Sequence, residues 1–258
     1  WRYIADDGVT ASFGLAADEY LMGGYGEASG DVPPTLRLYT YRPVCVMVGR
    51  FQNVSAEIKE PLHLCFGGGV RNVRGVALED AGGPGVELNR RPTGGGTIIM
   101  GEGQLGVALI RSGNSPQTPH HPREVLEECA GGVLEGLRLL GIEGASFRSR
   151  NDIEVGGRKI AGLGLYSDEQ GALLFHASIM IDFDVRLMLS LLNVPGEKHP
   201  DQCVRALESR LTTVRSELGR RVSTPEAREV FKEGFGAVFG AGMKHQPLAG
   251  EELAGIGD

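Results

Sequence analysis

A short run of this chain combines two cationic side chains with three successive glycines: Arg90, Arg91, Pro92, Thr93, Gly94, Gly95, Gly96 and Thr97. Glycine lacks a Cβ, so the backbone can approach a ligand closely, and successive N–H groups can form an anion-binding concavity. Arginine adds a rigid fork of donors for phosphate or carboxylate. The run therefore predicts a loop that grips an acyl-phosphate or a nucleotide, with a structural role open for one of the arginines.

A second run further along the chain places a lysine beside a predicted turn: Asn151, Asp152, Ile153, Glu154, Val155, Gly156, Gly157, Arg158, Lys159, Ile160, Ala161 and Gly162. Two glycines between alternating segments are typical of a β-hairpin. Lys159 then stands near the start of the second strand. A compact ammonium at such a place can stabilise negative charge that develops on a reacting acyl group.

The two runs together resemble the lipoate–protein ligase A family, whose superfamily also holds octanoyltransferases and biotin ligases. Three further segments extend the resemblance, which covers roughly residues 10 to 235: Val48–Gln52, Phe175–Asp182 and Glu208–Thr213. The resemblance implies an α/β (α+β) fold of mixed, largely antiparallel sheets flanked by helices. It also predicts one catalytic domain over residues 1–240, a glycine-rich insertion near 61–88 and a flexible tail over 241–258.

The resemblance further implies roles for individual residues. Lys159 is the catalytic residue, which contacts the acyl carbonyl and the α-phosphate. The substrate and nucleotide are bound by a larger set: Arg90, Arg91, Thr93, Gly94, Gly95, Gly96, Asn151, Asp152, Gly162 and His176. Asp152 either reaches Mg²⁺ through the nucleotide or caps the hairpin, and His176 either orients the site or is a satisfied core histidine. Val48, Gly49, Ala161 and Gly162 are expected to form the pocket wall.

The function expected first is that of a lipoate–protein ligase. A carboxylic acid acylates an amine at neutral pH only after activation, which ATP and Mg²⁺ supply by forming an acyl-adenylate from lipoate or octanoate. The acyl group then passes to a lysine of a lipoyl acceptor domain, in a 2-oxoacid dehydrogenase or the glycine cleavage H protein. Lipoyl domains are typically acidic, so the site should have a positive rim. The family's accessory domain is not evident here, so we expect that it is either absent or supplied by a separate accessory subunit.

Two alternatives stay open. An ATP-independent lipoyl or octanoyl transferase would carry the acyl group on an accessible cysteine of low pKa. Residues 145–150, where one branch has its nucleophile, hold no cysteine, which favours the ligase, whereas Cys65 in the insertion remains a candidate. The other alternative is a non-catalytic lipoate-binding homologue, supported by Met100 in place of a family histidine and opposed by the Lys159 run.

Composition agrees with a soluble cytoplasmic enzyme. The 258 residues are 41% hydrophobic and 23% charged, with a net charge of −7 and no apolar run long enough for a membrane span. The negative charge argues against nucleic-acid or anionic-membrane partners. The four cysteines form no CxxC pair, so free thiols are expected and a structural zinc site is not.

Periodicity predicts the main elements. Helices are expected at residues 11–22, 122–140, 185–192 and 223–239, with Thr224 as N-cap of the last. Asp18 is placed on or near the exposed side of the first helix, and Cys129 on the core stripe of the second. Strands are expected at residues 36–41, 44–49 and 86–88, and residues 97–100 and 107–110 are expected to be adjacent strands.

Overall fold

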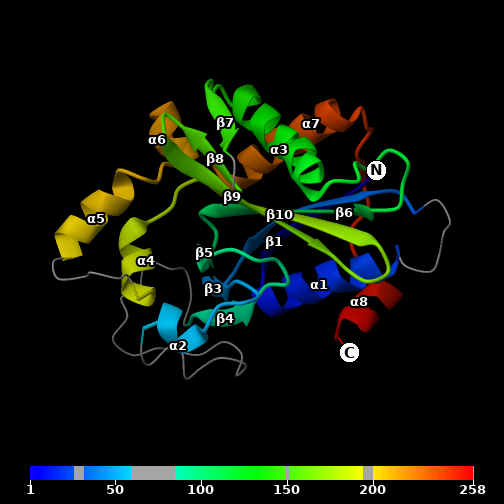
Figure 1. Ribbon diagram of the computed structural model, residues 1–258, viewed down its shortest axis with the longest axis horizontal. Helices are drawn as coiled ribbons and strands as arrows, with labels where there is room; N and C mark the ends of the chain where they lie inside the picture. The colour runs from blue at the N-terminus through cyan, green and yellow to red at the C-terminus, as the bar shows by residue number, and fades with distance from the viewer. Residues whose placement is uncertain (26–31, 60–84, 149–150, 194–199, 258) are drawn as a thin grey trace.

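The computed structural model describes residues 1–25, 32–59, 85–148, 151–193 and 200–257, and its elements form two sheets flanked by helices (Figure 1). The large sheet has eight strands, in the order β11 (Lys244–His245), β1 (Arg2–Val9), β2 (Thr35–Tyr41), β6 (Gln104–Ser112), β10 (Ala172–Met180), β9 (Arg158–Ser167), β8 (Asp152–Val155) and β7 (Ala145–Arg148). The small sheet has the order β4 (Glu87–Arg90), β3 (Cys45–Val48) and β5 (Ile98–Met100).

Most strand pairs are antiparallel. In the large sheet only β1 with β2 and β1 with β11 run parallel, and in the small sheet only β3 with β4. The expected fold class, mixed and largely antiparallel sheets flanked by helices, is confirmed. The expected pairing of residues 97–100 with 107–110 is wrong, because β5 pairs with β3 and β6 pairs with β2 and β10.

The described residues contain these helices: α1 (Ala11–Gly23), α2 (Val54–Glu57), α3 (Pro122–Leu139), α4 (Val185–Leu191), α5 (Pro200–Glu208), α6 (Val214–Leu218), α7 (Thr224–Phe239) and α8 (Glu251–Gly257). The ends of α3 follow from sequence: proline occupies its first turn and Gly141, at φ 95°, follows its C-terminus. In α7 the N-cap is Ser223, whose hydroxyl accepts from the Glu226 N–H, and Thr224 is the first helical residue. No helix in this part of the chain has the length and apolar character to cross a membrane.

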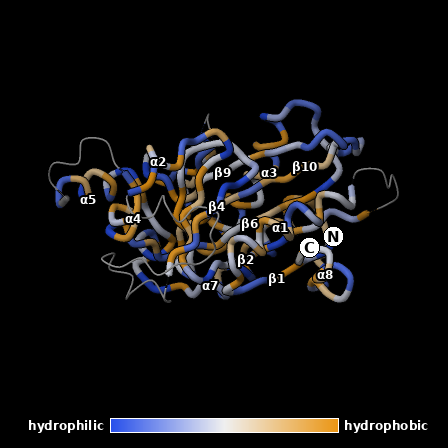
Figure 2. The backbone as a smooth tube through the Cα atoms, turned by 90° about the horizontal axis from the view of Figure 1, so that it is seen from below, coloured by the Kyte–Doolittle hydropathy of each residue, from blue (hydrophilic) through white to orange (hydrophobic). Residues whose placement is uncertain are grey.

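The large sheet separates two layers (Figure 1). On one face α3 and α7 pack together over Leu36, Leu38, Val107 and other apolar side chains. The two helix backbones touch, since a Cβ on Gly234 would lie 2.6 Å from the Gly136 nitrogen. On the opposite face lie α1 and the small sheet. The tube view shows the most apolar segments along the central strands (Figure 2).

Two expectations about the periphery differ from the structure. Asp18 is only 1% exposed, because its carboxylate is paired with Arg37 and His176 rather than facing water. Residues expected to form a flexible tail instead carry β11, which pairs with β1, and α8, which packs on α1. Arg2 holds α8 through an ion pair with Glu252 at 2.5 Å. Of the expected insertion, residues 60–84 lie outside the described residues, and the expected strand at 86–88 corresponds to β4.

Candidate active site

A cavity of about 290 Å³ lies between the small sheet and the α1-side face of the large sheet. Its floor is opened by two glycines of β9, which stand opposite larger residues of β10 in the sheet register: Gly162 faces Ser178, and Gly164 faces His176. Successive residues of a strand point to opposite faces, so Gly162 and Gly164 share the face that carries His176. The two positions without side chains therefore leave room for Lys159, which a Cβ on Gly162 would approach to 3.0 Å, and for Thr93, which a Cβ on Gly164 would approach to 3.0 Å.

Lys159 reaches this floor from the start of β9. The preceding Gly156 and Gly157, at φ 55° and 77°, make the expected two-residue hairpin turn. The Lys159 backbone is fixed from outside the sheet: its N–H donates to the Arg210 carbonyl and its own carbonyl accepts from the Thr212 N–H, both at 2.8 Å. The side chain then passes over Gly162, where a Cβ would lie 3.0 Å from Nζ.

The Lys159 ammonium is oriented by a carboxylate. Its Nζ lies 2.7 Å from Asp152 Oδ1, and both side chains are about one-third exposed, at 32% and 33%. Arg158, the neighbouring cation, takes a different partner, Glu217, at 2.7 Å. An ammonium has three N–H donors, so Lys159 can keep Asp152 and still donate to a ligand in the cavity. Asn151 also lines the cavity and donates from Nδ2 to the Leu163 carbonyl at 3.0 Å.

The two arginines of the glycine run use their guanidinium groups on backbone carbonyls. Arg90 donates to the carbonyls of Gly49, Arg50 and Gln52 at 2.8 to 3.1 Å. Arg91 is 7% exposed and donates to the Met47, Gly94 and Gly96 carbonyls at 2.6 to 3.1 Å. The structure thus gives both arginines a loop-holding role, whereas the sequence predicted phosphate or carboxylate contacts and left a structural role open for one of them.

Arg91 nevertheless changes the electrostatics of the cavity that it lines. Burial lowers the pKa of its guanidinium to about 10. Among the described residues no carboxylate lies within ion-pair distance of this guanidinium. A buried cation that is satisfied only by neutral carbonyls favours negative charge nearby. The cavity therefore favours developing negative charge, such as that on an acyl oxygen.

The glycine run contributes unequally to the cavity. Thr93 and Gly96 line it, whereas Gly94 and Gly95 are absent from its lining residues. Thr93 is 1% exposed, and its Oγ1 has no hydrogen-bond partner in the described part of the chain. A buried hydroxyl without a partner is uncommon and costs free energy. The Thr93 hydroxyl is therefore a candidate to hydrogen-bond a ligand in the cavity. Gly95, at φ 97°, leaves room for the Arg91 guanidinium, whose Nη2 would lie 3.0 Å from a Cβ there.

His176 lines the cavity and is also hydrogen-bonded within the protein, as expected of a satisfied core histidine. It lines the cavity, and its Nε2 lies 2.9 Å from Asp18 Oδ2. Asp18 in turn accepts from Arg37 Nη1 at 3.0 Å, and Arg37 Nε donates to Asp6 at 2.6 Å. Arg37 is fully buried, at 0% exposed, so this chain of charges lies beneath the cavity floor. The histidine ring is thereby held in one orientation as part of the cavity wall.

The apolar wall differs from the expected one. Gly162 is the single member of the expected set among the lining residues; the wall is made instead by Met47, Ile98, Ile99, Met100, Met180, Phe183 and Met188. Arg210 and Leu211 also line the cavity. The sequence did not predict these residues because they come from both sheets, from α4 and from the segments that precede α4 and follow α5. The register of β3 against β5, which places Cys45 opposite Met100, brings several of them together.

The cysteines and the acidic residues of the described chain take no part in the cavity lining. Cys45 and Cys129 are buried, and Cys203 on α5 is half-buried. Burial raises the pKa of the Cys129 thiol to about 12 and that of Cys45 well above its ordinary value. The core position expected for Cys129 is confirmed. Cys65 lies outside the described residues, and within them no three His, Cys, Asp or Glu side chains converge to hold a metal ion.

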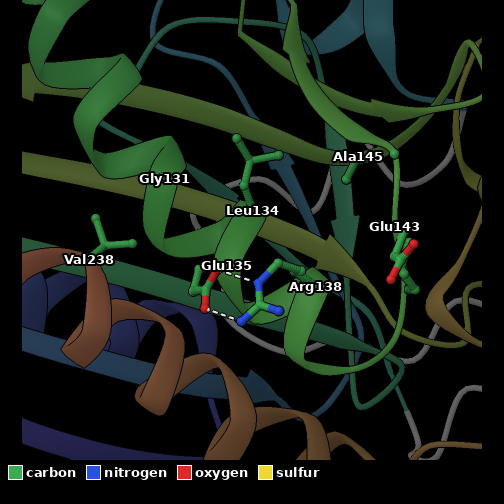
Figure 3. A pocket seen from close by; sticks show the side chains of 9 residues that line it. Gly131, Leu134, Glu135, Arg138, Glu143, Ala145 and Val238 are labelled. Atoms are coloured by element: carbon green, nitrogen blue, oxygen red, sulfur yellow. Dashed lines mark hydrogen bonds and ion pairs between the residues drawn. The ribbon is translucent and has the colours of Figure 1, made fainter.

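A second, larger hollow of about 390 Å³ lies on the far face of the large sheet, between α3, α7 and β7 (Figure 3). Its charged residues are Glu135, Arg138 and Glu143, and Leu134 and Val238 supply apolar surface. Arg138 is bonded to Glu135 through Nε and Nη2, at 2.8 and 2.7 Å. This hollow holds none of the residues predicted to do chemistry.

Comparison with known proteins identifies the family to which the chain is similar. The family model described as "Lipoyl protein ligase A/B catalytic domain" matches residues 10–236. Octanoyltransferase LipM of Symbiobacterium thermophilum is 30% identical over 261 residues, covering 93% of this chain and 86% of that protein. Octanoyltransferase LipM of Brevibacillus brevis is 28% identical, covering 98% of this chain and 92% of that protein.

Solved structures share the fold. A bipartite lipoate protein ligase from Thermoplasma acidophilum, solved as part of a lipoylation system with its E2 lipoyl domain, matches with a TM-score of 0.77 at 22% identity, covering 99% of this chain and 89% of that one. A lipoate-protein ligase A bound with ATP matches with a TM-score of 0.75 at 21% identity, covering 99% and 92%. At these identities the likeness concerns the fold alone.

The relatives correct the function expected first. An ATP-dependent lipoate–protein ligase was the main expectation from sequence, and the curated relatives named above, together with those of Geobacillus kaustophilus and Bacillus subtilis, are octanoyltransferases. The absence of cysteine from residues 145–150, which favours the ligase, is therefore not evidence for ATP chemistry in this chain. The alternative, acyl transfer without ATP, agrees better with these relatives.

Proposed function

Because the chain belongs to the lipoyl protein ligase A/B catalytic domain family, we propose that it is an octanoyltransferase, which moves an octanoyl group from a thioester donor to a lysine of a lipoyl acceptor domain. The observation that carries the proposal is the position of Lys159: its ammonium, oriented by Asp152, lies over Gly162 at the edge of an apolar cavity. A cavity of roughly 300 Å³ is at the lower end for small-molecule sites, which suits one short acyl chain.

The acyl chain is bound by the apolar wall. Four methionines line the cavity, and methionine adapts its shape to fill irregular space around a flexible chain. Each methylene that leaves water contributes about 0.8 kcal/mol. Binding of the acyl chain in the cavity therefore fixes the position of the thioester carbonyl beside Lys159.

The chemistry is the replacement of a thiol by an amine at this carbonyl. The neutral acceptor amine attacks the carbonyl carbon, a C–N bond forms, and the carbonyl oxygen becomes negatively charged. Lys159 donates a hydrogen bond to that oxygen, and the buried positive charge of Arg91 also favours negative charge there. The C–S bond then breaks, the thiolate leaves with the proton given up by the amine, and an amide remains.

We propose direct attack by the acceptor amine, since none of the cysteines in the described residues lines the cavity. A Cys65→Ser variant tests this step. Unchanged transfer agrees with direct attack, whereas an inactive, folded variant would assign the nucleophile to Cys65.

The function is tested by the intact mass of a lipoyl domain after incubation with the chain and an octanoyl thioester of a carrier protein. We expect a gain of one octanoyl group without ATP. A parallel reaction with free octanoate and Mg-ATP should give no gain. Product that forms only in the ATP reaction would refute the transferase.

A further inference from the structure

The turn between β3 and α2 presents an aromatic side chain to solvent. Phe51 is 88% exposed, whereas the other exposed large apolar side chains of the described residues are 39% to 45% exposed. Single exposed apolar residues are common on protein surfaces, so exposure alone has little meaning. What distinguishes Phe51 is the structure that holds it there.

The Phe51 turn is fixed by an unusual number of hydrogen bonds. Arg90 donates to three carbonyls of this turn, those of Gly49, Arg50 and Gln52. Gln52 Oε1 accepts from the Gly49 N–H at 2.8 Å and from the Thr97 hydroxyl at 2.9 Å. A surface turn held this firmly loses little conformational entropy when a partner binds.

The same bonds place the turn at the border of the cavity. The Arg50 N–H donates to the carbonyl of Thr93 at 3.1 Å, and both Thr93 and Thr97 line the cavity. A Cβ on Gly49 would lie 2.1 Å from the Gly95 carbonyl oxygen, so this turn and the glycine run are in direct contact. The Phe51 turn therefore lies directly beside residues of the cavity wall.

Arg50 adds a cation to the aromatic surface. Its guanidinium carbon lies 5.7 Å from the ring centre of Phe51 and 5.3 Å from that of Tyr166, so it lies against two rings. In the described part of the chain no carboxylate is within ion-pair distance of Arg50. Its charge is therefore available to an acidic partner, on a protein whose net charge is −7.

We propose that Phe51 and Arg50 form the docking surface for the acceptor, an acidic protein domain that presents its lysine to the cavity. The proposal rests on the proposed acyl transfer and deepens it. A lysine has only a four-carbon stem, so the body of the acceptor must touch the border of the cavity for its amine to reach the carbonyl. An ordered aromatic residue beside an arginine is the usual centre of such a contact.

The test separates docking from chemistry by using two acceptors. The full chain and its Phe51→Ser variant transfer octanoyl from a carrier thioester either to a lipoyl domain or to Nα-acetyl-lysine methylamide. We expect the KM for the domain to rise about tenfold in the variant, with kcat and the rate on the small acceptor unchanged. The matched control is Leu139→Ser, an exposed apolar residue at the end of α3 that is 42% exposed.

Arg50→Gln tests the electrostatic part. The KM for the domain should rise about threefold at low salt, and the difference should disappear at high salt. An unchanged KM for the domain in Phe51→Ser, or an equal loss with the small acceptor, overturns the proposal.

A direct binding measurement tests the docking surface even if the thioester reaction does not occur. The affinity of a fluorescently labelled lipoyl domain for the chain and for Phe51→Ser is measured without a donor. Weaker binding by the variant supports the docking surface even if octanoyl transfer is not observed. Equal binding refutes the docking surface whatever the reaction.

Discussion

Two hollows among the described residues differ more in the side chains that line them than in volume. The outer hollow between α3, α7 and β7 has about 390 Å³, and the inner cavity has about 290 Å³. Its charged pair, Glu135 and Arg138, satisfies itself at the surface. The inner cavity is lined by groups whose burial is costly, among them Arg91, Thr93 and His176. Buried polar groups, rather than volume, distinguish the reactive site.

The charges of the two regions also respond differently. In the outer hollow the hydrogen bond from Arg138 lowers the pKa of Glu135, and the same bond raises the pKa of Arg138. The charged forms of Glu135 and Arg138 therefore stabilise each other, as in an ordinary surface ion pair. At the inner cavity burial lowers the pKa of Arg91. Burial thus disfavours the charged form of Arg91 until a negatively charged ligand enters the cavity and compensates it.

The largest difference between the regions should appear on removing one cation from each. Lys159→Ala is expected to reduce kcat/KM for octanoyl transfer about 100- to 1000-fold, as the loss of one donor to a developing oxyanion does. Arg138→Gln, its counterpart in the outer hollow, should leave kcat/KM unchanged. Steady-state kinetics and circular dichroism of both variants check this. A folded, active Lys159→Ala variant would remove the assigned role.

Removing one carboxylate from each region compares their stability. Asp18→Asn leaves Arg37 and His176 buried with a weaker partner, so we expect the free energy of unfolding to fall by about 2–3 kcal/mol. Glu135→Gln should leave it nearly unchanged, since the ion pair of Glu135 with Arg138 lies at the surface and is screened by solvent. Urea unfolding of both variants measures the difference. Equal losses would show that the Asp18 network has no special energetic weight.

A shorter substrate tests whether the inner cavity binds the acyl chain. A hexanoyl thioester buries two methylenes fewer than an octanoyl thioester, which corresponds to about 1.6 kcal/mol, or roughly a 15-fold higher KM. Filling the outer hollow with Ala145→Leu should leave this ratio unchanged. Steady-state kinetics with each thioester separately give the ratio of the two KM values. A KM ratio near one would show that the acyl chain does not bind in the inner cavity.

The smallest effect concerns the thiols. The folded-state pKa of Cys129 is raised to about 12 by burial, so its protonated form stabilises the fold below the unfolded value, near pH 9, and this contribution is lost as pH rises toward 12. At pH 8 we expect iodoacetamide to modify Cys203 and to leave Cys45 and Cys129 unmodified. Peptide mass spectrometry checks this. Labelling of Cys129 in folded protein would contradict its core position.

Local chemistry made several elements predictable. The Gly156–Gly157 hairpin, the limits of α3 and the core position of Cys129 follow from turn residues, caps and apolar spacing. The runs around Gly94 and Lys159 also led to the correct family. One wrong structural expectation concerned a residue whose partner lies far away in sequence. Asp18 was expected at the surface, and its partner His176 is 158 positions away.

By itself, then, the sequence determined the fold class, the family and the position of Lys159 after a two-glycine turn, because these depend on short runs of residues. Only the tertiary structure decided how the site is built. It turned Arg90 and Arg91 toward backbone carbonyls, paired Lys159 with Asp152, and separated β5 from β6 into different sheets. Each of these outcomes depends on how the folded backbone places donors and acceptors, and a buried group such as the Arg91 guanidinium must be satisfied by whatever acceptors the fold brings within reach.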